Sequence, residues 1–555
     1  MKKHHILLLS VLIFGFFLRF YQIDKIPSGF YSDEALVGYE AFSILKTGKD
    51  QYGNIFPVTF KAFGDYRPGL FIYSTVPFIW LFGLNEFGTR LPSVVFSTVT
   101  IFVIYIIAKL LFKNKKIALF SSLLFAISPW SIVFARMSHD TNLSTLVVST
   151  AIYCLLKACI SGNKRLFLMA CFLFALSLYV YYTTRVFVPL FFIFSAFYFR
   201  RYFHKKQIVL GMLVAAVILL PLCRVLTNRE TGWSRINAVN LWTDPGIKAK
   251  TESLVHEDVL MNQSYSKIFH NKFVGVGYAF LKSFTSHFTP EFLLYSGDPI
   301  KMYQIPDTGI LLFIEPVLII TGVLILWKKE FQWNLLLLAW FLIGIFPDTL
   351  TRLYPAAARI HLALPVVSMV AAVGFSNIIF RLKRTAIWGK LGMLILIIII
   401  SYNMIYYFHS HFIHAPVRYA SEWHYGLRDL IAQIKPVANN YDQIWVSKRV
   451  WGWVNFAFYL KYPPEKMQKE IMLSEKNEYG LGWVYQFGKY YFDDIPSQFD
   501  YNKNILYIGE RNEFPDSMKA MLTVLYPDHS EAFIAVTTEE MRKSCKECSI
   551  EFKKL

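Results

Sequence analysis

Long apolar segments alternate with short basic loops along the first three quarters of the chain. Each segment approaches the roughly 20 residues that a helix needs to cross the hydrocarbon core of a bilayer. Because lipid offers no hydrogen-bond partners to the backbone, we expect each segment to be an α-helix. The eleven candidate transmembrane segments are residues 5–21, 90–112, 117–136, 141–160, 166–182, 184–199, 207–226, 309–327, 333–349, 357–378 and 387–408.

A further apolar run at residues 69–84 decides the topology. If this run crossed the membrane, the loop KNKK at residues 113–116 and the later basic loops would face outward, against the positive-inside rule. If it lies at the interface, all of these loops face the cytoplasm together with the N-terminal MKK. The pattern therefore predicts a multi-pass cell-membrane protein with a cytoplasmic N-terminus and an extracytoplasmic C-terminus.

This topology divides the chain into a membrane module and an outer domain. Residues 1–408 form the predicted transmembrane module, with one outer loop at residues 22–89 and a second, longer one at residues 227–308. Residues 409–555 contain short β-rich runs beside the helical stretch YGLRDLIAQIK. We expect this tail to form a small extracytoplasmic α/β domain.

Composition supports a membrane protein and argues against other classes. Of the 555 residues, 55% are hydrophobic and only 17% are charged, which lies outside the range of soluble domains. The formal net charge of +19 would attract nucleic acid. Because many of the basic residues fall in the predicted cytoplasmic loops, we expect the lipid bilayer as a partner and no nucleic acid.

One cysteine pair, Cys545 and Cys548 in CKEC, has the spacing of a metal or redox site. A single pair without a second is weak evidence for zinc. A local disulfide or two free thiols fits this pair better.

The stretch SDEALVGYEAFSILKTG in the first outer loop has the features of a surface helix. We expect Ser32 at its N-cap, acidic residues in its first turn and Gly48 beyond its end. An apolar side would let the helix lie flat on the bilayer. The residues of that side are Leu36, Val37, Ala41, Ile44 and Leu45.

Two explanations fit the acidic pair Asp33 and Glu34 at the start of this helix. Carboxylates in a first turn complement the helix dipole and need no other purpose. The same dipole keeps a carboxylate ionised, which suits a general base that accepts a proton from an attacking hydroxyl. Asp33 and Glu34 are therefore candidate catalytic residues.

A second acid, Asp140 in FARMSHDTN, lies at the outer end of a predicted helical hairpin. It would either cap the next helix or face a polar cavity, where charged residues near the apolar layer tend to gather.

Several cationic residues are expected at the same membrane face as Asp140. Two or three of them together could hold a phosphate, and arginine is favoured for its planar fork. Each could instead place its charged group at the membrane interface while the apolar part of its side chain stays in lipid. These residues are Arg67, Arg136, Arg185, Arg359 and His361.

The order of these segments resembles the GT-C polytopic glycosyltransferases, in the branch of protein O-mannosyltransferases and the aminoarabinose transferase of lipid A. The matching segments are SDEA, YRPGLFIYSTVPFIWLFGLNEFGTRLPS, the acid in ARMSHD, YYTTRVFVPL and ARIHLALPVVSMVAAVGF. The stretch SHFTPEFLLYSGDP at residues 286–299 is similar to the outer loop of bacterial members. The resemblance implies at least eleven spans and an outward-facing active site.

The resemblance also implies an inverting transfer of a sugar from a polyprenyl-phosphate donor to an acceptor hydroxyl. Asp33 matches the catalytic base of such enzymes, and Asp140 matches an acid that positions the acceptor or the base. Arg67 and Arg359 are the nearest matches to cations at the leaving phosphate, with Arg185 and His361 as further candidates. The chain departs from the family at YRPG, where members carry EKPP or HPPxGK.

No cluster of His, Asp and Glu has ligand spacing, so we expect no cofactor, and a divalent metal has no support in the sequence. The acceptor is left open among a protein, a glycan and a lipid. Two other functions compete with the proposed transfer: an oligosaccharyltransferase that uses a lipid diphosphate donor, and a flippase or transporter for polyprenyl lipids. A transporter would show internal repeats and charges near the bilayer midplane, and neither is evident.

Overall fold

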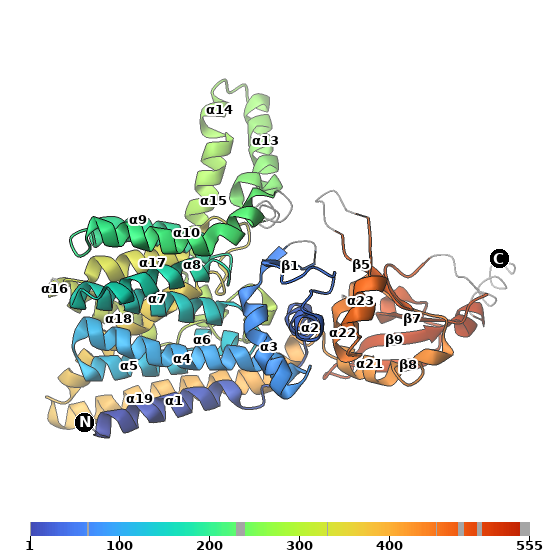
Figure 1. The fold of residues 1–555 in the computed structure, drawn as a ribbon, viewed down its shortest axis with the longest axis horizontal. Coiled ribbons are helices and arrows are strands. Elements are labelled where there is room, and N and C mark those ends of the chain that lie inside the picture. The colour runs from blue at the N-terminus through green and yellow to red at the C-terminus, as the bar shows by residue number, and fades with distance from the viewer. Residues whose placement is uncertain are drawn as a thin grey trace.

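The molecule consists of a helical bundle that carries a smaller domain at one end (Figure 1). The structure is a computed structural model that describes residues 2–63, 66–228, 239–329, 331–450, 452–475, 482–496 and 502–543. The N-terminus lies at the end of the bundle opposite to the smaller domain (Figure 1). This architecture confirms the expected fold class of a helical membrane module with a C-terminal α/β domain.

Every segment that was expected to span the membrane is helical. The helices are α1 (Lys2–Phe20), α4 (Glu86–Phe112), α5 (Lys115–Ile127), α6 (Pro129–Ala135), α7 (Thr141–Ser161), α8 (Lys164–Ser177), α9 (Thr184–Tyr198), α10 (Lys205–Thr227), α16 (Glu315–Lys328), α17 (Asn334–Thr349), α18 (Leu364–Leu382) and α19 (Ala386–His409). A 3₁₀ turn, η4 (His361–Ala363), leads into α18.

The number of membrane spans stays a prediction. Among the described residues, six helices are long and apolar enough to cross a bilayer, and the pair α5 and α6, bent by 56°, would make a seventh span. The helices α8, α9, α16 and α17 have 14, 15, 14 and 16 residues, fewer than the roughly 20 needed for a full crossing.

The first outer loop contains the helix that was expected to hold the acidic pair. It comprises α2 (Ser32–Thr47), an antiparallel hairpin of β1 (Thr59–Lys61) and β2 (Tyr66–Pro68), and α3 (Leu70–Phe82). Gly48 follows α2 with a φ of 68°, as predicted, because glycine adopts this left-handed conformation without steric cost. The N-cap prediction is wrong: Tyr31 occupies that position, and the Ser32 hydroxyl instead contacts Nδ1 of His424 at 3.0 Å.

The helix α2 does not rest on lipid by a single apolar face. It lies across the direction of the bundle helices, and both its apolar residues and polar ones such as Glu34, Glu40 and Ser43 are buried (Figure 1). The bundle helices α3 and α4 contact one side, and α22 (Trp453–Tyr459) and α23 (Pro464–Glu470) of the smaller domain contact another. A Cβ atom at Gly38 would lie 2.5 Å from the Phe458 ring, so the absence of a side chain there permits this close approach.

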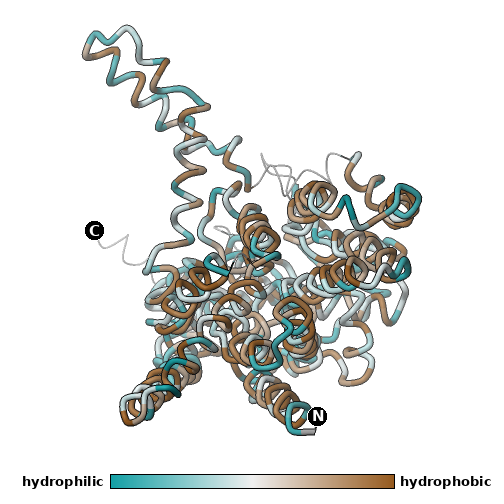
Figure 2. The backbone as a smooth tube through the Cα atoms, turned by 90° about the vertical axis from the view of Figure 1, so that its left-hand side faces the viewer, coloured by the Kyte–Doolittle hydropathy of each residue, from teal (hydrophilic) through white to brown (hydrophobic). Residues whose placement is uncertain are grey.

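The second outer loop projects from the side of the bundle (Figures 1 and 2). Its described part begins with η1 (Leu241–Thr243), α13 (Pro245–Leu260), α14 (Ser266–Phe269) and α15 (Lys272–Ser286). The chain returns to the bundle through a π-helical turn η2 (Glu291–Tyr295) and a 3₁₀ turn η3 (Lys301–Tyr303).

The C-terminal domain is built on a mixed seven-stranded sheet of order β4-β5-β6-β3-β7-β9-β8. The central strand β3 pairs in parallel with β6 and β7, and the other pairs are antiparallel. The strands are β3 (Gln443–Val446), β4 (Met472–Leu473), β5 (Val484–Phe487), β6 (Tyr490–Phe492), β7 (Ile505–Gly509), β8 (Leu522–Leu525) and β9 (Glu531–Thr537). The remaining helical elements are η5 (Ser410–His414), α20 (Ala415–Arg418), α21 (Leu427–Ile434), η6 (Ala438–Asn440), η7 (Lys448–Val450) and η8 (Arg511–Glu513). Cys545 and Cys548 lie outside the described residues.

Two apolar cores hold the molecule together. One fills the bundle around α4, α5, α7 and α18. The other runs from α2 and α3 into the sheet of the C-terminal domain, where it includes Leu36, Phe458 and Ile444. Because the second core is continuous, the C-terminal domain is packed firmly against the first outer loop.

Candidate active site

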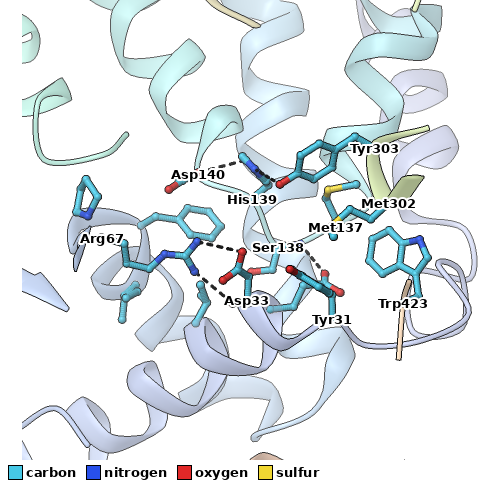
Figure 3. A pocket seen from close by; sticks show the side chains of 15 residues that line it. Tyr31, Asp33, Arg67, Met137, Ser138, His139, Asp140, Met302, Tyr303 and Trp423 are labelled. Carbon is cyan, nitrogen blue, oxygen red and sulfur yellow. Dashed lines mark hydrogen bonds and ion pairs between the residues drawn. The ribbon is translucent and has the colours of Figure 1, made fainter. Parts of the chain in front are cut away.

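A pocket lies where the first outer loop, the turn between α6 and α7, η3 and the segment before α21 meet (Figure 3). It encloses about 450 Å³, including the space at its open mouth. The structure thus brings together two outer loops and the start of the C-terminal domain around one cavity.

Asp33 and Arg67 face each other in this pocket. The Arg67 guanidinium lies 3.7 Å from the Asp33 carboxylate and also donates to the Asp33 carbonyl oxygen at 3.4 Å. The side chains of Asp33 and Arg67 remain 36% and 20% exposed. Asp33 is placed by the first turn of α2, and Arg67 is placed by β2, where it pairs with Phe60 of β1. Both charged groups are therefore accessible from the cavity (Figure 3).

Asp140 also lines the pocket, at the position before the first turn of α7. Its side chain makes no capping hydrogen bond to α7, so helix capping does not account for this residue. One carboxylate oxygen lies 3.1 Å from Nδ1 of His139. The two acids that the sequence singled out therefore line the same cavity.

His139 connects Asp140 to the opposite wall of the pocket. Its Nδ1 accepts a hydrogen bond from the Thr141 N–H at 3.2 Å, and its Nε2 lies 3.3 Å from the Tyr303 hydroxyl. Burial lowers the pKa of His139 to about 3, and the Arg67 charge contributes in the same direction. Burial likewise raises the pKa of Tyr303 well above its usual value. Both side chains are therefore neutral hydrogen-bonding groups near pH 7.

Glu34 also lines the pocket, but its carboxylate is bound in a buried ion pair with Arg90. Its two carboxylate oxygens accept hydrogen bonds from Nε and Nη2 of Arg90 at 2.9 and 2.7 Å, and one also accepts the Ser138 N–H at 2.7 Å. Arg90 is fully buried and also donates to the carbonyl oxygens of Ile23, Pro27 and Gly29. The ion pair fixes α2 to α4 and to the turn that carries Asp140. This geometry favours a positioning role for Glu34 over the catalytic contact considered from the sequence.

Two other arginines of the expected cationic cluster have internal partners away from this pocket. Nη1 of Arg359 donates to Asp348 at 2.9 Å and to the Thr351 hydroxyl at 2.7 Å. Arg136 is fully buried and donates to main-chain carbonyl oxygens, including that of Ile26 at 3.0 Å.

The remaining two candidates also lie apart from the pocket. Arg185 donates to the Leu178 carbonyl oxygen at 3.2 Å and covers the Tyr182 ring at 4.7 Å. His361 is buried, with Nδ1 2.7 Å from the Thr145 hydroxyl. The structure therefore corrects the expectation of one cationic cluster. The sequence placed these residues at one membrane face but carried no information on their lateral positions within it.

The outer loop SHFTPEFLLYSGDP, at residues 286–299, is anchored by two buried polar side chains. His287 lies 2.8 Å from the Asp348 carboxylate, and Asp298 accepts the Ala357 N–H at 2.6 Å. Burial raises the pKa of Asp298 to about 7. These contacts fix the course of the chain that delivers Met302 and Tyr303 to the pocket.

Several pocket residues escaped the sequence reasoning. His139 stands next to Asp140 in SHD, and this proximity to a candidate acid was a usable signal. Tyr31, two residues before Asp33, offered the same kind of signal. Met302, Tyr303 and Trp423 gave none, because they come from segments far along the chain that meet the first outer loop only in the fold. Within the described part of the chain, no group of three or more His, Cys, Asp or Glu side chains is arranged to hold a metal ion. The expectation of a metal-free reaction is not tested by this observation.

Comparison with known proteins gives a family match and a shared fold. Residues 67–223 match the family model described as dolichyl-phosphate-mannose-protein mannosyltransferase. This segment contains Arg67 and Asp140 and begins after Asp33. No curated protein matches the sequence.

One solved structure with a similar fold is ArnT from Cupriavidus metallidurans in the apo state. The TM-score is 0.54 and the sequence identity is 12%, and the match covers 97% of this chain and 99% of ArnT. ArnT bound to undecaprenyl phosphate matches with a TM-score of 0.51 and 12% identity, over 96% and 97% of the two chains.

The oligosaccharyltransferase AglB from Archaeoglobus fulgidus, in complex with an inhibitory peptide and a dolichol-phosphate, matches with a TM-score of 0.50 and 11% identity. Here the match covers 82% of this chain and only 63% of AglB, so this chain spans less than two thirds of that protein. Over residues 67–223 the chain is similar to the mannosyltransferase family, and its fold is similar to those of ArnT and AglB.

Proposed function

We propose that this protein transfers a sugar from a polyprenyl-phosphate donor to an acceptor hydroxyl at the extracytoplasmic face of the cell membrane. The observation that carries the proposal is the meeting of Asp33, Asp140 and Arg67 around one open pocket at the domain end of the bundle. The polyprenyl phosphates bound to ArnT and AglB support a lipid-linked donor of the same chemical class.

The proposed reaction is a single displacement with Asp33 as the general base. The Asp33 carboxylate accepts the proton of the acceptor hydroxyl, and the oxygen forms a bond to the anomeric carbon. The bond from that carbon to the phosphate oxygen breaks, and the electron pair leaves with the polyprenyl phosphate. One displacement inverts the anomeric configuration. The partial exposure of Asp33 supports this role, since a general base must come within hydrogen-bond reach of the hydroxyl.

Arg67 is the residue to which we assign the leaving phosphate. Fixed positive charge near a developing negative charge lowers the barrier most effectively where water is excluded. The planar guanidinium of Arg67 can present two N–H groups to phosphate oxygens.

The neutral groups of the pocket suit recognition of the sugar. Tyr303 and His139 offer hydrogen bonds without adding charge, and Asp140 lies next to the His139 ring. Tyr31 and Trp423 contribute aromatic surface to the same cavity (Figure 3). We assign Asp140 the positioning of the acceptor.

The orientation in the membrane follows from the same proposal. The N-terminus and α2, which carries Asp33, lie at opposite ends of the bundle (Figure 1). With the basic loops in the cytoplasm, the pocket and the C-terminal domain would face outward, where the lipid-linked donor and the acceptor would meet.

A donor screen with the purified protein tests the proposal. Labelled polyprenyl-phosphate mannose, glucose, galactose and arabinose are supplied separately, together with a polyprenyl-diphosphate sugar as the matched control. We expect consumption of at least one monophosphate donor with release of polyprenyl phosphate, both with and without a metal chelator. Consumption of the diphosphate donor alone would contradict the proposal and favour an oligosaccharyltransferase.

A further inference from the structure

The segment from η1 to α15, residues 241–286, forms a lateral arm that leaves the side of the bundle. Figures 1 and 2 show it extending across the direction of the bundle helices in both views. Because those helices run along the membrane normal, the arm runs parallel to the membrane plane. Its two ends attach at the same place, since the Leu241 N–H donates to Leu350 at 3.0 Å and His287 contacts Asp348 at the end of α17.

This attachment point sets the depth of the arm. Asp348 and Leu350 follow the apolar part of α17, at the end opposite to the basic loop that contains Lys328 and Lys329. With that basic loop in the cytoplasm, the arm leaves the bundle at the level of the outer leaflet.

The tip and one helix of the arm expose large apolar side chains. The residues Leu260, Met261, Ile268, Phe269, Phe273 and Leu281 are between 60% and 75% exposed. So many exposed large apolar side chains in one segment are uncommon on parts of proteins that face water, and they indicate contact with a membrane or another protein.

Charges are distributed unequally along the arm. The acidic residues Glu252, Glu257 and Asp258 are all on α13, which also carries Lys248 and Lys250, whereas residues 259–288 contain three lysines and no acidic residue. Trp242 and Phe273 pack edge to face, and Lys272 lies 4.7 Å above the Trp242 ring. Aromatic residues and lysines beside an apolar stripe are typical of segments in the headgroup region of a bilayer.

The apolar surface of α15 continues that of the membrane bundle. Phe280 packs on Phe346 of α17 with ring centroids 6.1 Å apart, and Phe288 packs on Phe341 at 6.2 Å. The outward side of α17 exposes leucines, including Leu338, as expected of a helix in contact with lipid. A lipid surface that covers α17 would therefore extend onto α15 without interruption.

We propose that the arm is immersed in the outer leaflet, with α15 and the tip among the lipids and the acidic α13 toward the water. The three lysines of the tip and α15 would contact anionic headgroups. The arm thus adds a membrane-anchoring surface separate from the transmembrane helices.

Site-specific quenching tests this arrangement in proteoliposomes of phosphatidylcholine and phosphatidylglycerol. Bimane is attached at Phe273→Cys on α15 or at Lys248→Cys on α13, in a variant whose six native cysteines are replaced by serine. Nitroxide-labelled lipid should quench the probe at position 273 several-fold more than at position 248, and aqueous iodide should show the reverse order. Met472→Cys, in the C-terminal domain, is the control. At this position iodide should quench the probe and nitroxide-labelled lipid should not.

Equal quenching by iodide at positions 273 and 248, without quenching by nitroxide lipid, would overturn the proposal. A second measurement needs no cysteine replacement: photoreactive benzoylphenylalanine at position 273 of the native chain should yield lipid adducts. Adducts only to a second copy of the chain or to another protein would show that the apolar surface is a protein interface instead.

Discussion

Two clusters of charged residues lie at the domain-facing end of the bundle. In one the central carboxylate is buried among internal partners, and in the other it is exposed to a cavity. Around Asp348, Arg359, His287 and the Ala356 N–H all bind the same fully buried carboxylate. Around Asp33, by contrast, the carboxylate is 36% exposed and the Arg67 group stands at 3.7 Å across an open pocket. The sequence assigned Arg67 and Arg359 the same role, whereas the fold gives them different surroundings.

This difference separates a carboxylate that stabilises the fold from one that can take part in the reaction. A buried carboxylate whose partners are all internal stabilises the connections between segments, since losing one partner leaves a desolvated charge. A carboxylate on a cavity wall, next to a cation and neutral hydrogen-bonding groups, can exchange protons with a ligand. Glu34 belongs with the first kind although it adjoins Asp33 in the sequence, because Arg90 and Ser138 already bind both of its oxygens.

The largest expected effect is on the reaction itself. Asp33→Asn removes the proposed general base, so transfer should fall about 10²- to 10⁴-fold while the thermal midpoint stays unchanged. The measurement is the rate of donor consumption per folded molecule. Asp429→Asn, at an exposed position of the C-terminal domain, is the control and should keep the wild-type rate. Wild-type turnover in Asp33→Asn would remove this residue from the mechanism.

The next effect is on stability and arises from Glu34. Glu34→Gln leaves the buried Arg90 guanidinium without its anionic partner, which should cost about 3 to 5 kcal/mol of stability. Thermal unfolding in detergent should show this loss, and the fraction that remains folded should still transfer sugar. Normal stability together with complete loss of transfer would mean that Glu34 takes part in the chemistry.

Substitution of Arg67 and of Arg359 tests the difference between the exposed and the buried cluster. Arg67→Gln should lower kcat/KM for the donor about 10- to 100-fold without a change in the thermal midpoint, since hydrogen bonds to a charged group contribute about 1.5 to 3 kcal/mol. Arg359→Gln should show the opposite pattern, with a lower thermal midpoint and an unchanged kcat/KM for the folded fraction. If Arg359→Gln alone weakened donor use, the phosphate site would lie at the second cluster.

The last expected effect concerns pH and the docking of the C-terminal domain. Burial lowers the pKa of His424 to about 4, and its Nδ1 contacts the Ser32 hydroxyl at 3.0 Å. The folded state therefore binds the proton less tightly than the unfolded state, so stability is full above pH 6.5 and falls as the pH drops toward 4. Between pH 7 and 4, His424→Gln should lose up to about 3 kcal/mol less stability than the wild type. Parallel losses in the two proteins would assign the acid sensitivity to other groups.

The sequence was sufficient for the helices and for four residues that line the pocket, one of them Glu34. Apolar runs located the membrane helices because burial in lipid requires long apolar segments. Asp33, Arg67 and Asp140 were found because they lie in the two outer loops that follow the first helix and the next helical hairpin, and these loops meet in the fold.

The other features of the site could not be predicted, because they depend on contacts between distant segments. The hydrophobic periodicity of the sequence carries no information on such contacts. The sequence placed Arg185, Arg359 and His361 at one membrane face with Asp140, yet each is directed to a different internal partner. The burial of α2 on several sides depends on α22, more than 400 residues later in the chain. Tyr303 and Trp423 reach the pocket from loops whose sequence gave no sign of their position.

A structure of the protein with bound undecaprenyl phosphate would test the central claim most directly. We predict that the phosphate lies within hydrogen-bond distance of the Arg67 guanidinium, in the pocket that holds Asp33, with Arg359 still bound to Asp348. A phosphate held by Arg359, or located outside the Asp33 pocket, would contradict the account.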